Sequence, residues 1–237
     1  MPSPYRELKE RAWAANQELP RRGLALLTFG NASALDRARG VMAIKPSGLE
    51  YDRLRPEDLV VLDLEGQVVE GSLRPSSDTR THLVLYRAFA GVGGIVHTHS
   101  TYATGWAQAR LAIPVYGTTH ADQVAEDVPC TEVIPASALA GDYETETGNL
   151  ILAAFRGRDP LQVPMALVAC HGPFAWGADV EAAVLNATML EEIARLAFVT
   201  RTLAPEAARL PEALVRKHFE RKHGKDAYYG QPERGRR

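Results

Sequence analysis

The feature of this sequence that most limits its possible folds is an alternation of short apolar runs with longer segments of helical periodicity. The apolar runs predict strands at 24–29, 41–44, 59–64, 94–99, 111–116 and 165–170. Helices are predicted at 4–19, 81–90, 101–109 and 180–203, and again after Pro211. Strands interleaved with helices are typical of a layered α/β domain, so we expect that architecture.

Clusters of Gly, Pro, Ser and Asn mark where these elements should end. The first helix is expected to stop before Pro20, because proline interrupts helical hydrogen bonding. Glu65-Gly66 predicts a hairpin turn that leads into a strand at 67–70. Gly30-Asn31-Ala32-Ser33 and Lys45-Pro46-Ser47-Gly48 predict turns that follow apolar strands.

The charge and hydropathy of the chain exclude two classes of partner. The 237 residues carry 27 Lys and Arg against 29 Asp and Glu, a net charge of −2. Binding to nucleic acid depends on many contacts between basic side chains and phosphates, so no nucleic-acid partner is expected. No apolar run approaches the roughly 18 residues of a membrane helix, so no membrane partner is expected either.

Length and cysteine usage predict one domain in a reducing compartment. A hydrophobic fraction of 46% is typical of a globular chain. We expect a single domain over 1–231 and a disordered tail over 232–237. Charged residues from Glu7 to Arg11 argue against the apolar core of a signal peptide. Cys130 and Cys170 match no paired metal or redox spacing, so we expect a cytoplasmic protein.

The strongest local motif is His97-Thr98-His99. Residues two apart in a strand point to the same face, so the two imidazoles converge as two ligands of one metal ion would. An isolated pair of this kind fits equally well two histidines that only form hydrogen bonds at a sheet edge. His171 follows the apolar run 165–170 and is placed to add a third ligand. Three protein ligands and one open position are typical of catalytic zinc.

Three short polar clusters are candidates for binding phosphate. Ser76-Ser77-Asp78-Thr79 precedes the predicted helix at 81–90, where hydroxyls and free backbone N–H groups suit an anion. The same residues also fit simple helix capping by Ser77 or Asp78. The clusters at 30–33 and 45–48 contain similar small donors. Together the three clusters favour a phosphorylated ligand.

Two further polar segments and three histidines allow more than one interpretation. Thr118-Thr119-His120-Ala121-Asp122 places a carboxylate beside a histidine, which is either a general acid–base pair or part of a polar loop. Glu144 lies in a segment with the composition of a solvated turn. His82, His218 and His223 lie in helical or basic surroundings and are expected at the surface.

Taken together, these motifs resemble the class II aldolase/adducin superfamily, and within it the sugar-phosphate epimerases. The matching segments keep the order of the family and cover nearly the whole chain. They lie at 30–33, 45–48, 75–79, 93–100, 117–122, 146–149, 171–177 and 222–231. The tail from Pro232 onward is the visible departure from the pattern.

The resemblance implies an α/β fold of three layers, α/β/α, in which a single domain surrounds a central and largely antiparallel sheet. It also implies a ring-shaped homotetramer with active sites between neighbouring subunits. One divalent metal per subunit is implied, Zn²⁺ with Mn²⁺ or Co²⁺ as alternatives. The residues that match the three histidine ligands and the acidic position beside them are His97, His99, His171 and Asp78.

The resemblance also assigns roles to residues in the polar clusters. The phosphate-binding positions match Asn31, Ser47, Gly48, Ser76 and Ser77, with Lys45 nearby. The acid–base pair matches Asp122 and Tyr229, of which Tyr229 would come from the adjacent subunit. Further positions near the substrate match Thr118, Glu144 and His218.

Asp78 separates the branches of the superfamily, because the related aldolases place a glutamate there. The resemblance therefore implies a zinc-dependent epimerase that interconverts the ketopentose phosphates L-ribulose 5-phosphate and D-xylulose 5-phosphate, as in arabinose or ascorbate breakdown. Two alternatives stay open, a class II sugar-phosphate aldolase and a non-catalytic module like that of adducin. The adducin module lacks the metal histidines. A zinc hydrolase fits less well, because no dedicated water-activating base adjoins the histidines.

Overall fold

A computed structural model describes residues 3–139, 141–225 and 227–228 of the chain. Within these ranges seven strands form one sheet in the order β4-β3-β2-β1-β5-β7-β6, and every neighbouring pair is antiparallel. The strands are β1 (Asn31–Asp36), β2 (Val41–Ile44), β3 (Val60–Asp63), β4 (Val68–Glu70), β5 (Gly94–His97), β6 (Met165–Val168) and β7 (Gly172–Gly177). The predicted central, largely antiparallel sheet is confirmed.

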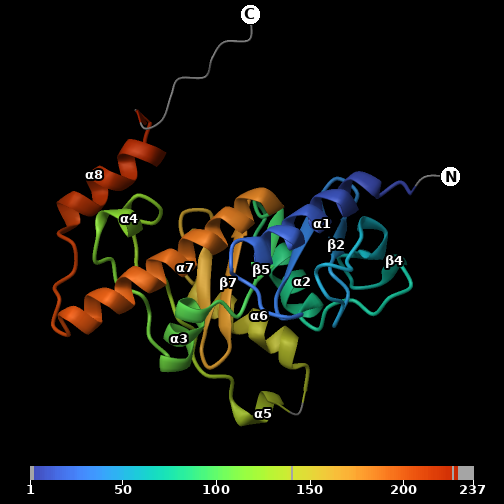
Figure 1. Cartoon of the computed structure of the whole chain (residues 1–237), viewed down its shortest axis with the longest axis horizontal. Coiled ribbons are helices and arrows are strands. Elements are labelled where there is room, and N and C mark those ends of the chain that lie inside the picture. Colours follow the sequence, from blue (N-terminus) through green and yellow to red (C-terminus); the bar gives the residue numbers. More distant parts are fainter. Residues whose placement is uncertain (1–2, 140, 226, 229–237) are drawn as a thin grey trace, which may run out of the picture.

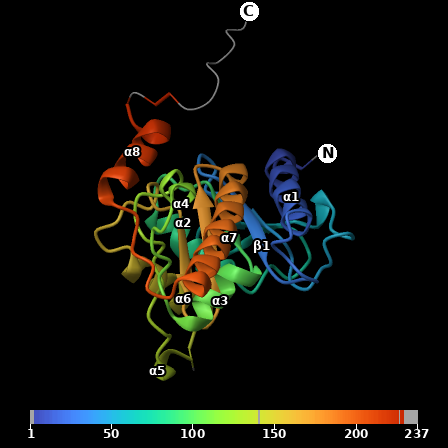
Figure 2. The ribbon, with the colours of Figure 1, turned by 60° about the vertical axis from the view of Figure 1, so that its left-hand side comes forward.

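Helices cover both faces of this sheet (Figures 1 and 2). They are α1 (Arg6–Arg21), α2 (Thr79–Ala88), α3 (Thr101–Ala109), α4 (Thr118–Ala121), α5 (Ala136–Leu139), α6 (Tyr143–Ala154), α7 (Val180–Leu203) and α8 (Glu212–His223), with a 3₁₀ turn at Pro56–Asp58. Helices α1, α3 and α7 pack on one face, and α2 and α6 pack together on the other. Helix α8 packs on α4 at one end of the molecule. In the described ranges, none of the helices is long and apolar enough to cross a membrane.

Strand β1 is fixed to the helices on both of its faces. The buried Asn16 of α1 donates a hydrogen bond to the Ala32 carbonyl (2.8 Å) and accepts one from the Ala32 N–H (2.9 Å). The pairing of β1 with β2 begins only at Ser33, so these two bonds satisfy the N–H and carbonyl groups of Ala32. From α2, His82 Nδ1 and the Tyr86 hydroxyl each lie 2.7 Å from Ser33 Oγ. The middle strand of the sheet therefore positions both outer layers.

Helix α7 lies close to the sheet because glycines lie beneath its first turns. A Cβ atom at Gly94 of β5 would lie 2.2 Å from Val180 Cα, and one at Gly177 of β7 would lie 2.6 Å from Ala182 Cβ. Asp179 caps the helix by accepting a 2.7 Å hydrogen bond from the Ala182 N–H. This close packing holds β5 and β7 side by side, and the candidate metal ligands lie at the ends of these strands.

Two strand boundaries differ from prediction. Residues 24–29 form no strand, since Leu26 and Leu27 are exposed and Leu27 has a φ of 54°, which interrupts an extended chain. Strand β1 begins instead at Asn31, inside a predicted turn. Gly172-Pro173, a pair of residues common in turns, begins β7. Apolar composition alone does not distinguish a strand from an exposed loop.

Three other elements also differ. Residues 111–116 contribute only an isolated bridge to Val128. Helix α1 continues through Pro20, because a proline in the last turn removes only one hydrogen bond there. Helix α6 begins at Tyr143, so the segment around Glu144 is the first turn of a helix rather than a solvated turn. The predictions for Tyr229 and for the tail at 232–237 concern residues outside the described ranges.

Candidate metal centre and active site

Three histidines converge where β5 ends and β7 begins. His97 is the last residue of β5, and His99 follows two positions later, just beyond the strand. His171 precedes β7, which is the antiparallel neighbour of β5. One potential ligand atom of each histidine lies within 4.8 Å of those of the other two, and the Nε2 atoms of His97 and His99 are 3.1 Å apart. The predicted three-histidine cluster is therefore formed.

The surroundings of His97 determine which ring nitrogen faces the cluster. Its Nδ1 lies 2.9 Å from the carbonyl oxygen of Pro173, which can only accept, so Nδ1 carries the proton. Its Nε2, which lies toward His99, is therefore the nitrogen left to bind a metal ion. Phe174 stacks on the His97 ring at 4.2 Å between centroids and 19° between planes, which holds the ring in place. A carbonyl on the distal nitrogen is typical of histidines that ligate metal ions.

The other two imidazoles also suit a metal ion. Burial first, and then the nearby His97, lower the pKa of both His99 and His171, so both rings are neutral at pH 7. His171 Nδ1 is buried and has no hydrogen-bond partner among the described residues. A buried nitrogen without a partner is costly, and a bound cation would satisfy it. The donor set therefore fits a divalent metal ion such as Zn²⁺.

Asp78 lies beside the histidines at the start of α2. Burial by itself would raise the pKa of its carboxyl, but His97, His82, His171 and a hydrogen bond from Asn31 together lower the pKa. That bond runs from Asn31 Nδ2 to Asp78 Oδ2 at 2.7 Å. The Asp78 side chain forms no capping bond with α2, so the capping interpretation is wrong for this residue. Asp78 remains a carboxylate facing the histidine cluster.

Two of the predicted phosphate-binding segments lie together. The Ser47 N–H donates to the Arg74 carbonyl (2.9 Å), and the Ser76 N–H donates to the Lys45 carbonyl (3.0 Å). A cavity of about 900 Å³ opens beside these two hydrogen bonds. It is lined in part by Ser47, Ser76, Ser77, Glu144, Arg74 and Arg80. The two arginines were not among the predicted residues, although Arg74 directly precedes Pro75-Ser76 in the sequence.

Lys45 is the buried cation of this region. Only 2% of its surface is exposed, and its Nζ lies 4.8 Å from the centre of the Tyr51 ring. Burial lowers the pKa of Lys45 to about 8. No carboxylate pairs with its ammonium group among the described residues. Gly48 has a φ of 67°, and no atom lies within 4 Å of where a Cβ atom would be, so the backbone there is accessible to a ligand.

Comparison with known proteins gives the family. The family model for the class II aldolase and adducin N-terminal domain matches residues 10–198. This chain belongs to that family. A structure described as L-fuculose 1-phosphate aldolase is 29% identical, with a TM-score of 0.79, and the match covers 93% of this chain and 97% of that one.

Two more solved structures are similar to this chain. YgbL from Klebsiella pneumoniae, described as a putative aldolase/epimerase/decarboxylase, is 25% identical with a TM-score of 0.70 and covers 91% of this chain and 99% of its own. The L-fuculose-1-phosphate aldolase of Thermus thermophilus is 26% identical with a TM-score of 0.64, covering 86% and 100%. The class II aldolase fold thus spans nearly the whole chain.

A second group of predicted residues lies where α4 and α8 pack together. Asp122, at the end of α4, accepts hydrogen bonds from Arg221 (2.6 and 2.9 Å) and lies 2.9 Å from His218 Nδ1, both on α8. Thr118 begins α4 and lines a small cavity against α7. In the part of the chain that the structure describes, no hydrogen bond or ring contact joins these residues to the metal histidines.

The surface location predicted for His82 is wrong. His82 is fully buried and is held at Nδ1 by Ser33 Oγ. Burial lowers the pKa of His82 to about 3, despite an opposing effect of Asp78. His82 lies one helical turn after Asp78 on α2, and the spacing of four residues puts both on the face toward the sheet. His218 is also half-buried rather than at the surface, because it contacts Asp122.

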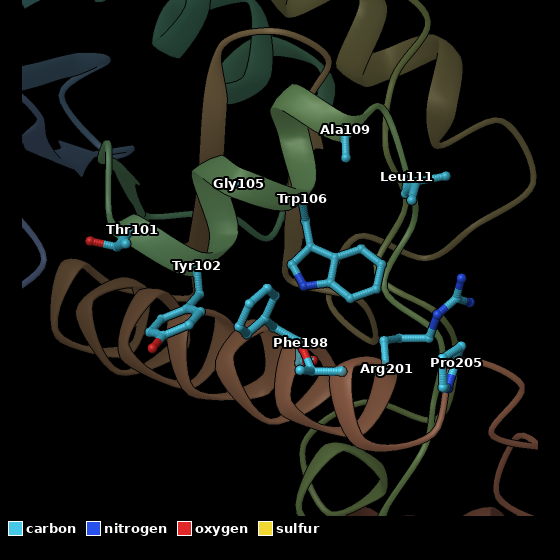
Figure 3. A pocket seen from close by; sticks show the side chains of 10 residues that line it. Thr101, Tyr102, Gly105, Trp106, Ala109, Leu111, Phe198, Arg201 and Pro205 are labelled. Carbon is cyan, nitrogen blue, oxygen red and sulfur yellow. The ribbon is translucent and has the colours of Figure 1, made fainter.

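A separate apolar groove between α3 and α7 offers no comparable chemistry (Figure 3). It has a volume of about 590 Å³, and Tyr102, Trp106 and Phe198 point into it. Arg201 is its only ionisable side chain besides the Tyr102 phenol. It contains none of the histidines or carboxylates described above. The groups suited to catalysis therefore lie at the histidine cluster and not in this groove.

Proposed function

We propose that this protein is a metal-dependent epimerase that interconverts L-ribulose 5-phosphate and D-xylulose 5-phosphate. The observation that carries the proposal is the arrangement of His97, His99 and His171 with the Asp78 carboxylate beside them. The cavity lined by Ser47 and Ser76 supports it, since the serine hydroxyls and the Arg74 side chain that also line it suit a sugar phosphate. The identification of Asp78 with the epimerase branch comes from the sequence resemblance.

The chemistry of the substrate defines what the site must do. C4 of a ketose 5-phosphate carries no acidic proton, so simple deprotonation cannot invert it, but breaking and re-forming the C3–C4 bond can. The aldehyde fragment then rotates between the two steps. A bound divalent ion, with zinc as the expected metal, supplies Lewis-acid stabilisation of the negative charge on the oxygens of the other fragment. The three histidines would hold that ion through neutral nitrogens.

The remaining residues orient the substrate and move protons. In this proposal Ser47, Gly48, Ser76, Ser77 and Lys45 hold the phosphate, which keeps the aldehyde fragment bound while it turns. Asn31 donates its side-chain amide to both Asp78 and Ser76, so its part in phosphate binding is to position these two side chains. The Oδ1 atom of Asn31 is buried without a partner among the described residues and can only accept a hydrogen bond.

In this proposal Asp122 and Tyr229 transfer the protons, and Tyr229 comes from a neighbouring subunit of a homotetramer. Thr118, Glu144 and His218 lie near the substrate. The two hydrogen bonds from Arg221 keep the Asp122 carboxylate ionised, as a base must be before it takes up a proton, and at the same time make it a weaker base. Burial opposes that effect, but Arg221 and His218 prevail and lower the pKa of Asp122. Glu144 lines the same cavity as Ser47 and Ser76, whereas Thr118 and His218 do not.

A class II sugar-phosphate aldolase is the second candidate. It is favoured by the 29% identity to a structure described as L-fuculose 1-phosphate aldolase. Such an enzyme would break the same kind of bond but release the aldehyde. A non-catalytic module like that of adducin is not favoured, because the resemblance implies that such a module lacks the metal histidines, and this chain brings His97, His99 and His171 together.

Product analysis distinguishes the candidates. The metal-loaded protein is incubated separately with L-ribulose 5-phosphate and L-fuculose 1-phosphate, and both ketose products and free aldehyde are measured. The epimerase proposal predicts D-xylulose 5-phosphate without aldehyde release, and predicts that a chelator stops the conversion. Free aldehyde from either substrate would favour the aldolase, and no reaction of either substrate would contradict both.

A further inference from the structure

We infer that Tyr143 is a further catalytic residue of the proposed reaction, whose hydroxyl donates a hydrogen bond to a substrate oxygen bound at the histidine cluster. The inference rests on the proposed function. Tyr143 is the first residue of α6, and its ring centroid lies 6.1 Å from that of His171, with 48° between the planes. Tyr143 is half-buried, so one side of the phenol is open to a ligand.

The first turn of α6 is fixed relative to Asp78. Arg80 on α2 forms a 2.7 Å ion pair with Asp142, the residue before Tyr143. The Thr81 hydroxyl donates a 2.7 Å hydrogen bond to the carbonyl of Glu144. Asp142 in turn caps α6 by accepting from the N–H and the hydroxyl of Thr145. These bonds place Tyr143 and Asp78 on two helix starts that are joined directly.

A glycine allows the two helices to approach. A Cβ atom at Gly148 of α6 would lie 2.7 Å from the Cβ of Val84 on α2. Only glycine permits this separation between the helices. The orientation of Tyr143 toward the histidines therefore depends on packing along the length of α2 and α6, and not on the exposed first turn alone.

The cluster needs a hydrogen-bond donor, and Tyr143 supplies one. The Nδ1–H of His97 is already used on the Pro173 carbonyl, and a carboxylate such as that of Asp78 can only accept, so neither supplies a donor to a substrate oxygen. The amide of Asn31 already donates to Asp78 and Ser76. The hydroxyl of a tyrosine keeps its proton at neutral pH, because the ordinary pKa of a phenol is about 10. A neutral hydroxyl complements the negative charge that develops on a substrate oxygen.

The test compares Tyr143→Phe with Tyr102→Phe. Both changes remove one hydroxyl from a partly buried ring, and Tyr102 packs on Phe198 in the α3–α7 groove. We expect Tyr143→Phe to lower kcat on L-ribulose 5-phosphate by about a hundredfold, as for other oxyanion donors. Tyr102→Phe should match the unmodified protein.

A second measurement does not depend on turnover. The protein is loaded with Co²⁺, and the change in its visible absorption is followed as L-ribulose 5-phosphate is added. Tyr143→Phe should keep the spectrum of the ligand-free protein but need about tenfold more sugar phosphate for the half-maximal change, the effect of one hydrogen bond.

The outcomes separate the two proposals. If the unmodified protein converts no ketopentose phosphate, the proposed function fails, and the Co²⁺ titration still tests Tyr143. If the unmodified protein is active and Tyr143→Phe has the same kcat and ligand affinity, the inference about Tyr143 is wrong. A changed Co²⁺ spectrum in ligand-free Tyr143→Phe would also overturn it, because the residue would then act on the metal site itself.

Discussion

Asn31 donates a 2.7 Å hydrogen bond from its side-chain amide to the carboxylate of Asp78, which joins the first residue of β1 to the start of α2. The two residues are far apart in the sequence and belong to different predicted clusters. Their contact places a carboxylate beside three histidines and lowers its pKa. The sheet and the helix layer meet at this bond.

Asn31→Ala removes this hydrogen bond and should shift the acid limb of the activity profile. Because the bond lowers the pKa of Asp78, that pKa rises in the variant and the carboxylate is protonated at a higher pH. We expect activity at low pH to fall more than activity at pH 8, measured as kcat/KM against pH. Asn149→Ala, which removes an exposed amide bound to Glu146, is the control and should leave the profile unchanged.

His171→Ala should abolish tight metal binding. Losing a residue that merely supports a ligand costs about 10–100-fold in affinity, and losing a ligand should cost at least as much. Metal content after dialysis, determined by elemental analysis, measures the effect. His223→Ala serves as the control, because His223 lies on α8 and contacts the Asp122 carbonyl instead of the cluster. Equal metal content in both variants would refute the three-histidine assignment.

Lys45 predicts a pH dependence of phosphate binding. Its pKa of about 8 means that the ammonium is charged at pH 7 and loses its charge as the pH rises toward 9. The affinity for a sugar phosphate should therefore fall across this interval, by at most about tenfold per pH unit. Lys45→Met should bind more weakly at pH 7 and show a flat profile. An unmodified protein whose KM is constant from pH 7 to 9 would contradict this role.

Gly94→Ala should destabilise the fold, because the added methyl group would meet the backbone of α7 at Val180. Overpacking of this kind costs about 1–3 kcal/mol. Gly105→Ala is the matched control, since Gly105 lies inside α3 with nothing near its missing Cβ. That change should raise the free energy of unfolding by about 0.5–1 kcal/mol. Urea denaturation of both variants tests the prediction.

His82 predicts a loss of stability in acid. The unfolded histidine takes up a proton near pH 6.5, but the buried one does so only near pH 3. The unfolded state therefore binds more protons between these values, and the free energy of unfolding falls by about 1.4 kcal/mol per pH unit as the pH drops through that range. His82→Gln should show a shallower dependence in urea denaturation from pH 4.5 to 7.5. An identical slope would contradict this account.

Local patterns predicted the elements whose signals lie within one segment. Helices 101–109 and 180–203 have the predicted bounds, and the strand around His97 places two imidazoles together. The same reasoning failed for 24–29, because apolar residues there are exposed. An apolar run predicts burial only if another part of the chain covers it.

Long-range contacts explain most of what the sequence could not predict. His82 is buried because Ser33 lies across from it, and that pairing follows from how α2 packs on β1. Asp122 is held by Arg221, which depends on how α8 packs on α4. Neither partner is visible in the surrounding sequence. The convergence of His97 and His99 could be predicted from spacing, whereas the meeting of His171 with them and the role of Asp122 came from the resemblance.

The measurement that tests the central claim most directly is a metal titration of the epimerase reaction. The protein is stripped with a chelator, dialysed, and supplied with increasing Zn²⁺ while D-xylulose 5-phosphate formed from L-ribulose 5-phosphate is measured. Our account predicts no conversion by the stripped protein and activity that rises linearly to one ion per chain. Full activity in the stripped protein, or none at any metal content, would contradict it.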